Sequence, residues 1–307
     1  MSATAASPTI LVTSAMGNQG RLLIPRLVAH GCTVRAYDIA ADEAALQRLG
    51  AAWAIRADLL DEGALAQAMA GADAVYHLGP NAHPREDEIG FAAIRAARGA
   101  GVDHFVFGSV LHPQIPALTQ HAMKLRVSVA LIESGLRWTV LEPAHYMQTL
   151  QHRAAFAGDP FRLTWSLDRR QALVDLADVA QVAAQVLVEG PAAHHGATYE
   201  LCSGACLTAG QIAEQLSALL DRSVGTVRVM PEEVIENVFG PDPDQARFAE
   251  RVRLFTTVAD WYSDNHFDGS STVLRALLGR APTTFAAFLA RDLAAWQATQ
   301  NLIPQAS

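Results

Sequence analysis

The residues from Ser14 to Gly20 have the types and spacing that could hold an anion. Gly17 and Gly20 follow the short apolar, β-branched run Ile10–Thr13, and a helical pattern of leucines comes next. A strand, a glycine turn and a helix N-terminus in this order direct unpaired backbone N–H groups at a ligand, and small residues let a pyrophosphate come close. Ala15 stands where the strict dinucleotide fingerprint has its second glycine, so an ordinary strand-to-helix turn is the alternative interpretation.

A second candidate for ligand binding is Asp38, which closes the next predicted strand, Cys32 to Tyr37. An acid about 20 residues beyond the glycine turn is where a dinucleotide fold holds the ribose hydroxyls. A carboxylate there also repels a 2′-phosphate, so we expect NAD as the cofactor. NADP stays possible, because Arg21 or Arg35 could reach round to neutralise a phosphate.

Composition narrows the class of protein. The chain has 307 residues, half of them hydrophobic, with a net charge of −8 and no run rich in Lys or Arg, so nucleic acid is not expected as a partner. No apolar run reaches the ~18 residues of a membrane helix. Met1 to Pro8 lacks the features of a secretory signal. The odd cysteine number, three, favours a reduced, cytoplasmic protein with thiols packed as small hydrophobes; oligomeric state stays open.

The first half of the chain alternates strands with helices. This rhythm predicts an α/β fold with a doubly wound parallel sheet, in which ligands lie across the carboxyl ends of the strands. The predicted strands are Ile10–Thr13, Cys32–Tyr37, Ala54–Ala57, Ala74–Leu78, His104–Phe107 and Trp138–Leu141. Their carboxyl ends are Ser14–Gly20, Asp38, Asp58, Gly79–Asn81, Ser109–His112 and Pro143–Tyr146, which is the site by topology.

Beyond Leu150 the rhythm changes. We expect residues 1–150 to form the nucleotide-binding domain and residues 151–307 a smaller α/β domain that binds substrate, with residues 170–190 returning to pack beside the first domain as a helix, Val174 to Val188. The acids after Arg85, which are Glu86, Asp87 and Glu88, suit a solvated helix start.

The glycine turn resembles that of the NmrA-like proteins, an atypical branch of the short-chain dehydrogenases/reductases. The resemblance continues over nearly the whole chain, through Ala57–Leu59, Gly101–Val106, Ser134–Leu141, Val174–Ala180, Leu207–Thr208 and Leu278–Phe285. It implies a Rossmann domain that binds NAD or NADP, with a smaller C-terminal domain over the substrate pocket. The cofactor site expected from topology and resemblance comprises Ser14, Met16, Gly17, Asn18, Gln19, Gly20, Asp38, Asp58, Leu59, Leu78, Gly79, Pro80, Ser109, Lys124 and Pro143.

The departures from the family concern the chemistry. The Tyr-x-x-x-Lys pair of ordinary short-chain enzymes is broken, because Gln120 holds the tyrosine's position four residues before Lys124. Ile39 aligns near the family's usual arginine for the 2′-phosphate of NADP. Glu142 precedes Pro143 where the family often has Arg-Pro.

Three residues are candidates for catalysis. Lys124 could orient the nicotinamide ribose or move a proton, unless it is a surface lysine at a helix start. His121, one turn earlier, could replace the missing acid, or it is a solvated loop histidine. Tyr146 ends the sixth strand, where the fold faces the nicotinamide, and is either the proton donor or a packing aromatic.

The substrate is expected to contact residues at the same edge of the sheet, namely Asn81, His112, His145 and Tyr146. Ser109 either hydrogen-bonds a ligand or caps the next segment. We expect no metal site, since no His or Cys group has ligand spacing.

These features favour an NAD(P)-dependent oxidoreductase that transfers hydride to a small, largely apolar carbonyl or activated alkene. Two alternatives remain open at the level of sequence. The first is a non-catalytic NAD(P)-binding redox sensor or regulator of the NmrA type. The second is a lyase or isomerase on the same dinucleotide-binding fold. The NmrA-like family includes both reductases and regulators, and loss of the tyrosine fits either.

Overall fold

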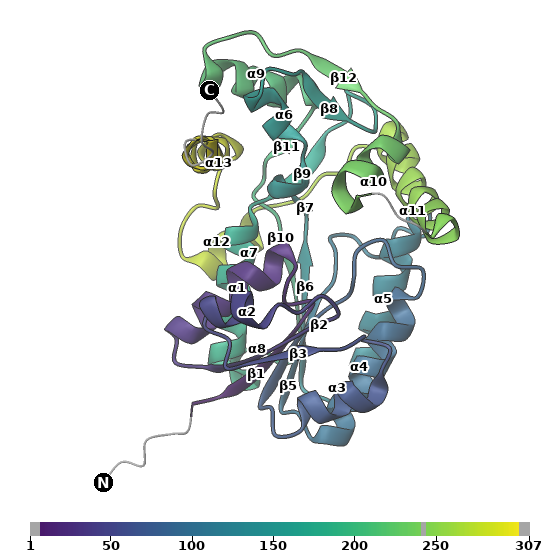
Figure 1. The fold of residues 1–307 in the computed structure, drawn as a ribbon, viewed down its shortest axis with the longest axis vertical. Helices are drawn as coiled ribbons and strands as arrows, with labels where there is room; N and C mark the ends of the chain where they lie inside the picture. Colours follow the sequence, from purple (N-terminus) through teal and green to yellow (C-terminus); the bar gives the residue numbers. More distant parts are fainter. Residues whose placement is uncertain (1–6, 241–243, 301–307) are drawn as a thin grey trace. The chain divides into compact units, whose positions relative to one another are not determined.

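The computed structural model describes residues 7–240 and 244–300, so most of the stretch Met1–Pro8 lies outside the described part. The chain divides into two compact units (Figure 1). The first unit comprises Met1–Pro143 and Leu176–Leu201, and the second comprises Ala144–Asp175 and Cys202–Ser307. The chain therefore leaves the first unit, builds part of the second, and returns before completing it.

A parallel sheet forms the centre of the first unit, as the strand–helix rhythm predicts. Its order is β10-β6-β5-β4-β1-β2-β3, and neighbouring strands pair in parallel. The strands are β1 Thr9–Thr13, β2 Thr33–Asp38, β3 Trp53–Arg56, β4 Ala74–Leu78, β5 His104–Gly108, β6 Trp138–Pro143 and β10 Ala197–Leu201. The order reverses between β1 and β4, so these two strands flank the crevice where such folds bind ligands.

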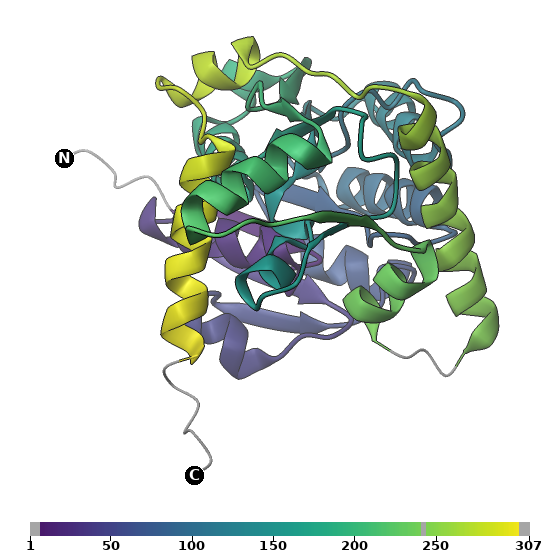
Figure 2. The same ribbon diagram turned by 90° about the horizontal axis from the view of Figure 1, so that it is seen from above.

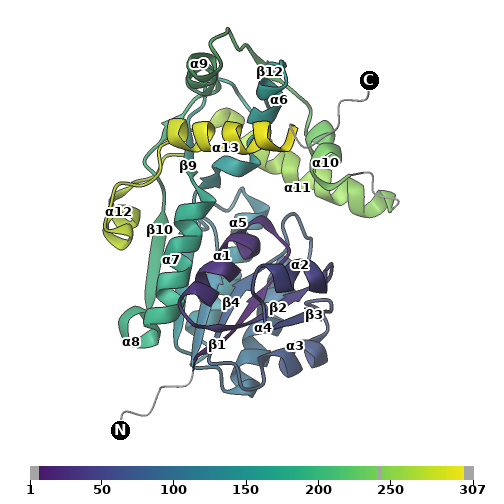
Figure 3. The ribbon, with the colours of Figure 1, turned by 60° about the vertical axis from the view of Figure 1, so that its left-hand side comes forward.

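Helices flank the sheet of the first unit. In one layer, α1 (Asn18–Ala29) packs beside α7 (Leu176–Glu189) (Figure 3). In another, α3 (Glu62–Met69) packs on α4 (Glu86–Ala100) and α4 packs on α5 (Thr119–Ile132). The buried core beneath these helices includes Leu11, Val75, Phe105 and Val127. The short helices α2 (Glu43–Arg48) and α8 (Pro191–His194) complete this unit.

Residues Leu176–Leu201 belong to the first unit, so the returning segment has other limits than the expected residues 170–190. The helix begins at Leu176 instead of Val174, because Gln171–Val174 form strand β9 of the second unit. Strand β10 also belongs to the first unit, where it pairs in parallel with β6. Ala197 lies opposite Thr139, and Leu201 lies opposite Pro143. Because β10 extends the main sheet, residues 176–201 lie in the first unit, whereas residues 144–150 lie in the second.

The second unit contains two small sheets and six helices among its described residues. One sheet has the order β11-β9-β7, and the other pairs β8 with β12. The strands are β7 His145–Tyr146, β8 Phe161–Leu163, β9 Gln171–Val174, β11 Cys206–Leu207 and β12 Thr226–Arg228. The helices are α6 His152–Phe156, α9 Ala209–Leu220, α10 Pro231–Phe239, α11 Gln245–Asp264, α12 Thr272–Leu278 and α13 Phe285–Gln300, and a 3₁₀ turn spans Met147–Thr149. Figure 2 shows α13, in yellow, beside α9.

Within the described residues, every helix is too short or too polar to cross a lipid bilayer.

Candidate functional site

The glycine turn after β1 is held by backbone geometry. Ser14 has a left-handed conformation (φ 49°), and its hydroxyl donates to the carbonyl of Leu78 on β4 at 2.9 Å. Gly17 N–H donates to Ser14 O at 3.0 Å, which closes the turn. A Cβ on Gly20 would lie 2.5 Å from the carbonyl oxygen of Ala15, so only glycine allows this approach. Ala15 itself is fully buried beneath the turn.

The N-terminus of α1 is available to an anion. Its N-cap is Gly17, which offers no capping side chain, and the first turn carries no acidic residue. A twelve-residue helix concentrates partial positive charge at this end, where the first N–H groups have no partner within the helix. These are the properties that let Ser14–Gly20 receive a pyrophosphate.

Asp38 lies directly beside this turn, as its sequence position predicts. Its side chain is largely buried. One carboxylate oxygen accepts from Met16 N–H at 2.9 Å, and the other accepts from Ala40 N–H at 2.8 Å. These two hydrogen bonds show that Asp38 stabilises the glycine turn. A carboxylate accepts about four hydrogen bonds, so Asp38 can also accept hydrogen bonds from a ligand. Arg35, which we considered as a partner for a 2′-phosphate, instead donates to the carbonyls of Ala68 and Ala70.

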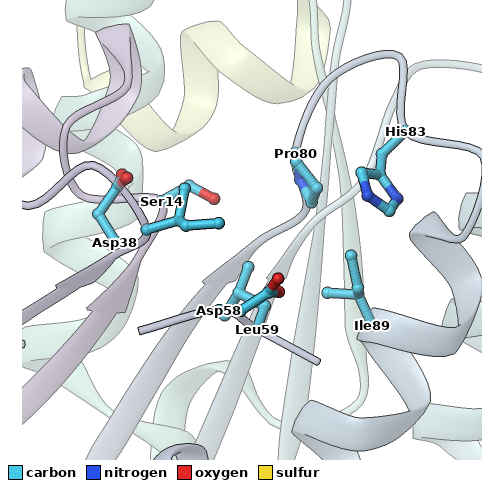
Figure 4. Close-up of a pocket in the computed structure, with 8 residues that line it drawn as sticks. Ser14, Asp38, Asp58, Leu59, Pro80, His83 and Ile89 are labelled. Carbon is cyan, nitrogen blue, oxygen red and sulfur yellow. The ribbon is translucent and has the colours of Figure 1, made fainter. Parts of the chain in front are cut away.

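An open pocket lies at this edge of the sheet (Figure 4). Its lining residues combine polar and apolar side chains from the ends of β1, β2, β3 and β4 and from α4. They are Ser14, Asp38, Ile39, Asp58, Leu59, Pro80, His83 and Ile89. Five of them belong to the predicted cofactor site.

Ile39, His83 and Ile89 were missed from the sequence as site residues. Ile39 is 63% exposed beside Asp38, which is unusual for an isoleucine. The sequence does not show this exposure, but the position of Ile39 directly after Asp38 could have suggested that it lines the site.

The lining of this pocket has the residue types that could hold the adenosine end of a dinucleotide. Apolar side chains of Ile39, Leu59 and Ile89 offer flat contact to a purine, and the exposed carboxylate of Asp58 can accept a hydrogen bond from an amino group. Asp38 also lines this pocket, at the position expected for an acid that holds ribose hydroxyls.

Lys124 is positioned by a buried carboxylate. Its ammonium group lies 2.5 Å from Glu86 Oε1, and the side chains are 18% and 5% exposed, respectively. Glu86 opens α4 and packs against the loop after β4, where a Cβ on Gly79 would lie 2.8 Å from its Oε1. Lys124 also lies above the ring of Phe107, 5.7 Å from its centroid. The Lys124–Glu86 ion pair therefore links α5, which carries Lys124, to the start of α4. Glu86 in turn packs against Gly79.

The prediction of a solvated helix start is wrong for Glu86 and holds for the exposed Glu88. Asp87 pairs with Arg126 at 2.6 Å, and Glu88 pairs with Arg85 at 2.6 Å. The first residue of α4 turns inward to Lys124, which the acidic run alone does not reveal.

His77, at the end of β4, is a buried polar residue of the same region. Its Nδ1 lies 3.1 Å from the hydroxyl of Thr13, and its ring stacks on Phe107 with a centroid distance of 5.9 Å. Burial, together with the charge of Lys124, lowers the pKa of His77 to about 3. His77 is therefore neutral at physiological pH and joins β1 to β4 below the crevice.

His121 lies in α5 and is buried, so its interpretation as a solvated loop residue is wrong. Its Nδ1 donates to the carbonyl of His112 at 3.1 Å, since a carbonyl can only accept. Burial lowers its pKa to about 4, with Lys124 contributing. A neutral imidazole whose hydrogen is on Nδ1 is a poor acid at neutral pH. His112 has a left-handed backbone (φ 54°) that aims its carbonyl at His121.

The other predicted residues of the first unit hold the same edge together. The hydroxyl of Ser109 is buried and makes no hydrogen bond within the described residues, while its N–H donates to Leu141 O at 2.8 Å. Pro143 O accepts from Leu111 N–H at 2.8 Å. Gln19 is buried in the first turn of α1 and donates to the Tyr76 hydroxyl, whereas Asn18 and Asn81 are exposed.

His145 and Tyr146 belong to the second unit and form β7. Burial lowers the pKa of His145 to about 4, and its Nε2 lies 3.0 Å from the Thr149 hydroxyl. Burial also raises the pKa of Tyr146 well above its ordinary value. His145 contacts the ring of Trp165 edge-on. Both residues therefore sit in an apolar environment.

Within the described part of the chain, no group of three or more His, Cys, Asp or Glu side chains is arranged to hold a metal ion.

Comparisons with known proteins place this site in a family. The family model described as NmrA-like family matches residues 6–289. NAD(P)H azoreductase of Xenophilus azovorans is 26% identical over 243 residues, 78% of this chain and 82% of the relative. Quinone oxidoreductase 2 of Escherichia coli (strain K12) is 26% identical over 288 residues, 90% of this chain and 96% of the relative.

A solved structure is similar over nearly the whole chain. The crystal structure of NmrA, described as a negative transcriptional regulator in complex with NAD, has a TM-score of 0.76 at 20% identity and covers 97% of this chain and 98% of its own. This likeness supports the fold, and the family model covers both units. The chain belongs to the NmrA-like family.

Proposed function

We propose that the protein is an NAD(P)-dependent oxidoreductase that reduces a small, largely apolar carbonyl or activated alkene. The observation that carries this proposal is the continuous edge formed by the glycine turn, the Asp38 pocket and the Lys124–Glu86 pair. The azoreductase and quinone oxidoreductase names of two relatives support a conjugated, electron-accepting substrate. The substrate is thus a small molecule, and we place the activity in the cytoplasm, where reduced nicotinamide cofactors are available.

The dinucleotide supplies the hydride when it is bound, and the chain supplies its binding and orientation. Ser14–Gly20 and the N-terminus of α1 would hold the pyrophosphate, and Asp38 would accept hydrogen bonds from the adenosine ribose. Lys124 would donate to the second ribose and would place positive charge near the anion that develops on the substrate. Glu86 limits the rotamers of Lys124 through the ion pair, so the ammonium is held in place before substrate arrives.

The environments of the candidate residues limit which of them can donate the proton to the substrate. Gln120 cannot ionise, and His121 has a lowered pKa and an occupied Nδ1–H. Lys124 and Tyr146 remain as donors. A phenol with a raised pKa keeps its proton until the developing oxyanion is strongly basic, which suits a donor that acts only late in the reaction.

A second candidate function is a redox sensor that binds NAD(P) without turnover. The burial of His121 and His145 against apolar surroundings favours it, because buried neutral imidazoles contribute little to proton transfer. The structural likeness to NmrA, which is described as a negative transcriptional regulator, also favours a sensor.

The experiment that separates the two functions combines binding and turnover. NADH and NADPH binding is titrated first, and oxidation of the bound reduced form is then followed with aldehydes, quinones and enones against a no-enzyme control. The proposal expects acceptor-dependent oxidation above that control. Stoichiometric binding with no oxidation by any acceptor contradicts the enzyme and supports the sensor.

A further inference from the structure

Two arginines of the first unit come from the elements on both sides of β2, the strand that ends at Asp38. Arg21 lies near the start of α1, and its Nε donates to the carbonyl of Met16 at 2.7 Å. Met16 is also the residue whose N–H donates to the Asp38 carboxylate at 2.9 Å. Only the backbone of Met16 therefore separates the Arg21 guanidinium from the carboxylate of Asp38.

Arg56 approaches the same carboxylate from the other neighbouring strand. It ends β3 and lies opposite Asp38 in the parallel register of β2 with β3. Its Nε donates at 3.3 Å to the carbonyl of Ile39, the exposed residue of the pocket lining that follows Asp38. The guanidinium of Arg56 is therefore held at the edge of the pocket, beside the backbone of Ile39.

Both guanidinium groups keep hydrogen-bond donors for a ligand. Arg21 and Arg56 are exposed, and each uses its Nε alone in the hydrogen bonds to the backbone. Among the described residues, neither of them forms an ion pair with a carboxylate. A guanidinium presents its N–H groups in a planar fork that matches the oxygens of a phosphate. The terminal nitrogens of Arg21 and Arg56 can therefore bind an anion beside Asp38.

We propose that Arg21 and Arg56 form a subsite for the 2′-phosphate of NADPH, so that the pocket accepts a phosphorylated adenosine ribose in spite of the Asp38 carboxylate. This inference rests on the proposed binding of the adenosine ribose at Asp38. A phosphate there would meet one carboxylate and two guanidinium groups, so the arginines would offset part of the repulsion by Asp38. NADH stays the tighter ligand, and NADPH binds more tightly than it would beside Asp38 alone.

Arg35 is the matched control for these two arginines. It lies in β2, the same strand as Asp38, but its guanidinium donates to the carbonyls of Ala68 and Ala70 and lies over the ring of Trp53. None of these three contact residues lines the pocket. Replacing Arg35 therefore removes the same charge from the same strand pair without removing a donor from the proposed subsite.

The test measures nucleotide binding by the full chain, so it does not depend on turnover. Adenosine 2′,5′-bisphosphate and 5′-AMP are titrated calorimetrically into the parent, Arg21→Met, Arg56→Met and Arg35→Met at low salt. We expect Arg21→Met and Arg56→Met each to lower the affinity for the bisphosphate relative to 5′-AMP roughly tenfold, because each removes one positive charge beside the 2′-phosphate. Arg35→Met should keep the parent's ratio. Added salt should weaken the bisphosphate more than 5′-AMP in the parent.

Two outcomes overturn the subsite while the nucleotide site stands. The first is an unchanged ratio of the two affinities in both Arg21→Met and Arg56→Met. The second is an equal loss in Arg35→Met, which identifies a general effect of net charge. A parent that binds neither nucleotide overturns the adenosine site of the proposed function, and the subsite with it. The expected ratios in a protein that oxidises no reduced cofactor support the subsite and contradict only the reductase.

Discussion

At the scale of single residues, the ion pair of Lys124 with Glu86 decides how the proposed catalytic role of Lys124 must be tested. Glu86 is buried, so removing the ammonium alone leaves a carboxylate without its partner, which commonly costs about 3–5 kcal/mol. We expect Lys124→Met to lose both stability and turnover. The double variant Lys124→Met/Glu86→Gln should recover most of the stability, while turnover stays roughly 10²-fold or more below the parent.

Thermal unfolding and turnover of the parent, both single variants and the double variant separate these effects. Glu86→Gln alone serves as the control, because it keeps the ammonium. A double variant that turns over substrate like the parent removes Lys124 from the mechanism.

Tyr146 is the second residue whose role is open to a direct test. Replacement by phenylalanine removes only the hydroxyl, so packing in β7 is preserved. If Tyr146 gives the proton, Tyr146→Phe lowers turnover roughly 10²-fold while cofactor affinity changes little. Parent-like turnover in both Tyr146→Phe and the Lys124 double variant assigns the proton to another group or to water.

Asp38 sets the expected preference for NADH over NADPH. A carboxylate facing a 2′-phosphate commonly costs about 1–3 kcal/mol, or roughly one to two decades in affinity. Asp38→Asn keeps one acceptor oxygen for the glycine turn and removes the charge, so it should narrow the preference by that amount. Calorimetric titration of both cofactors measures it. Tighter binding of NADPH by the parent contradicts the assigned role.

The sequence predicted site positions better than side-chain environments. The glycine turn, Asp38 and the strand ends follow from local patterns, because the carboxyl ends of parallel strands must share an edge. The burial of Glu86 and His121 depends on how α4 and α5 pack on the sheet and on each other, which no local pattern contains.

At the scale of elements, the pairing of β6 with β10 brings two carboxylates together. Glu142 and Glu200 are partners in the parallel register, where the family often has arginine at the first position. Burial, with Glu200 adding like charge, raises the pKa of Glu142 to about 7. The folded state therefore binds a proton that the unfolded state has released, and stability falls as the pH rises from about 4.5 to 7.

Glu142→Gln should remove this dependence. It should be close to neutral at pH 4 and should stabilise the protein by about 1–3 kcal/mol at pH 8, where the parent carries the buried charge. Chemical denaturation at the two pH values, with the less buried Glu200→Gln as the companion variant, measures the difference. An equal effect of Glu142→Gln at both pH values contradicts the account.

The sequence pattern predicts the longer helices and strands of this fold but not its two-residue strands. Five-residue strands such as β4 and amphipathic helices such as α4 carry enough residues to show a period. Strands β7 and β11 have two residues each, so they have no period and form only because β9 lies between them.

At the scale of the whole molecule, the chain assembles its two units discontinuously. The sequence predicts a helix that returns to the first unit, but it does not predict that β10 joins the main sheet. The partner of a strand depends on contacts between residues far apart in the sequence, which a local pattern does not contain. The resemblance to the NmrA-like family, confirmed by the family model over residues 6–289, fixed the fold class more firmly than the alternation of elements did.

The central claim, that this chain transfers hydride from a bound nicotinamide to a small acceptor, is tested most directly by isotope tracing. NADH carrying deuterium on the transferred position of C4 is incubated with the protein and an enone that supports its oxidation, because deuterium delivered to carbon stays in the product, and that product is analysed by mass spectrometry. We predict deuterium in the product of the parent at a yield matching the NADH consumed, and little product from the Lys124→Met/Glu86→Gln variant. Binding of the labelled cofactor with no acceptor that consumes it, or consumption without deuterium on a carbon of the product, contradicts the claim.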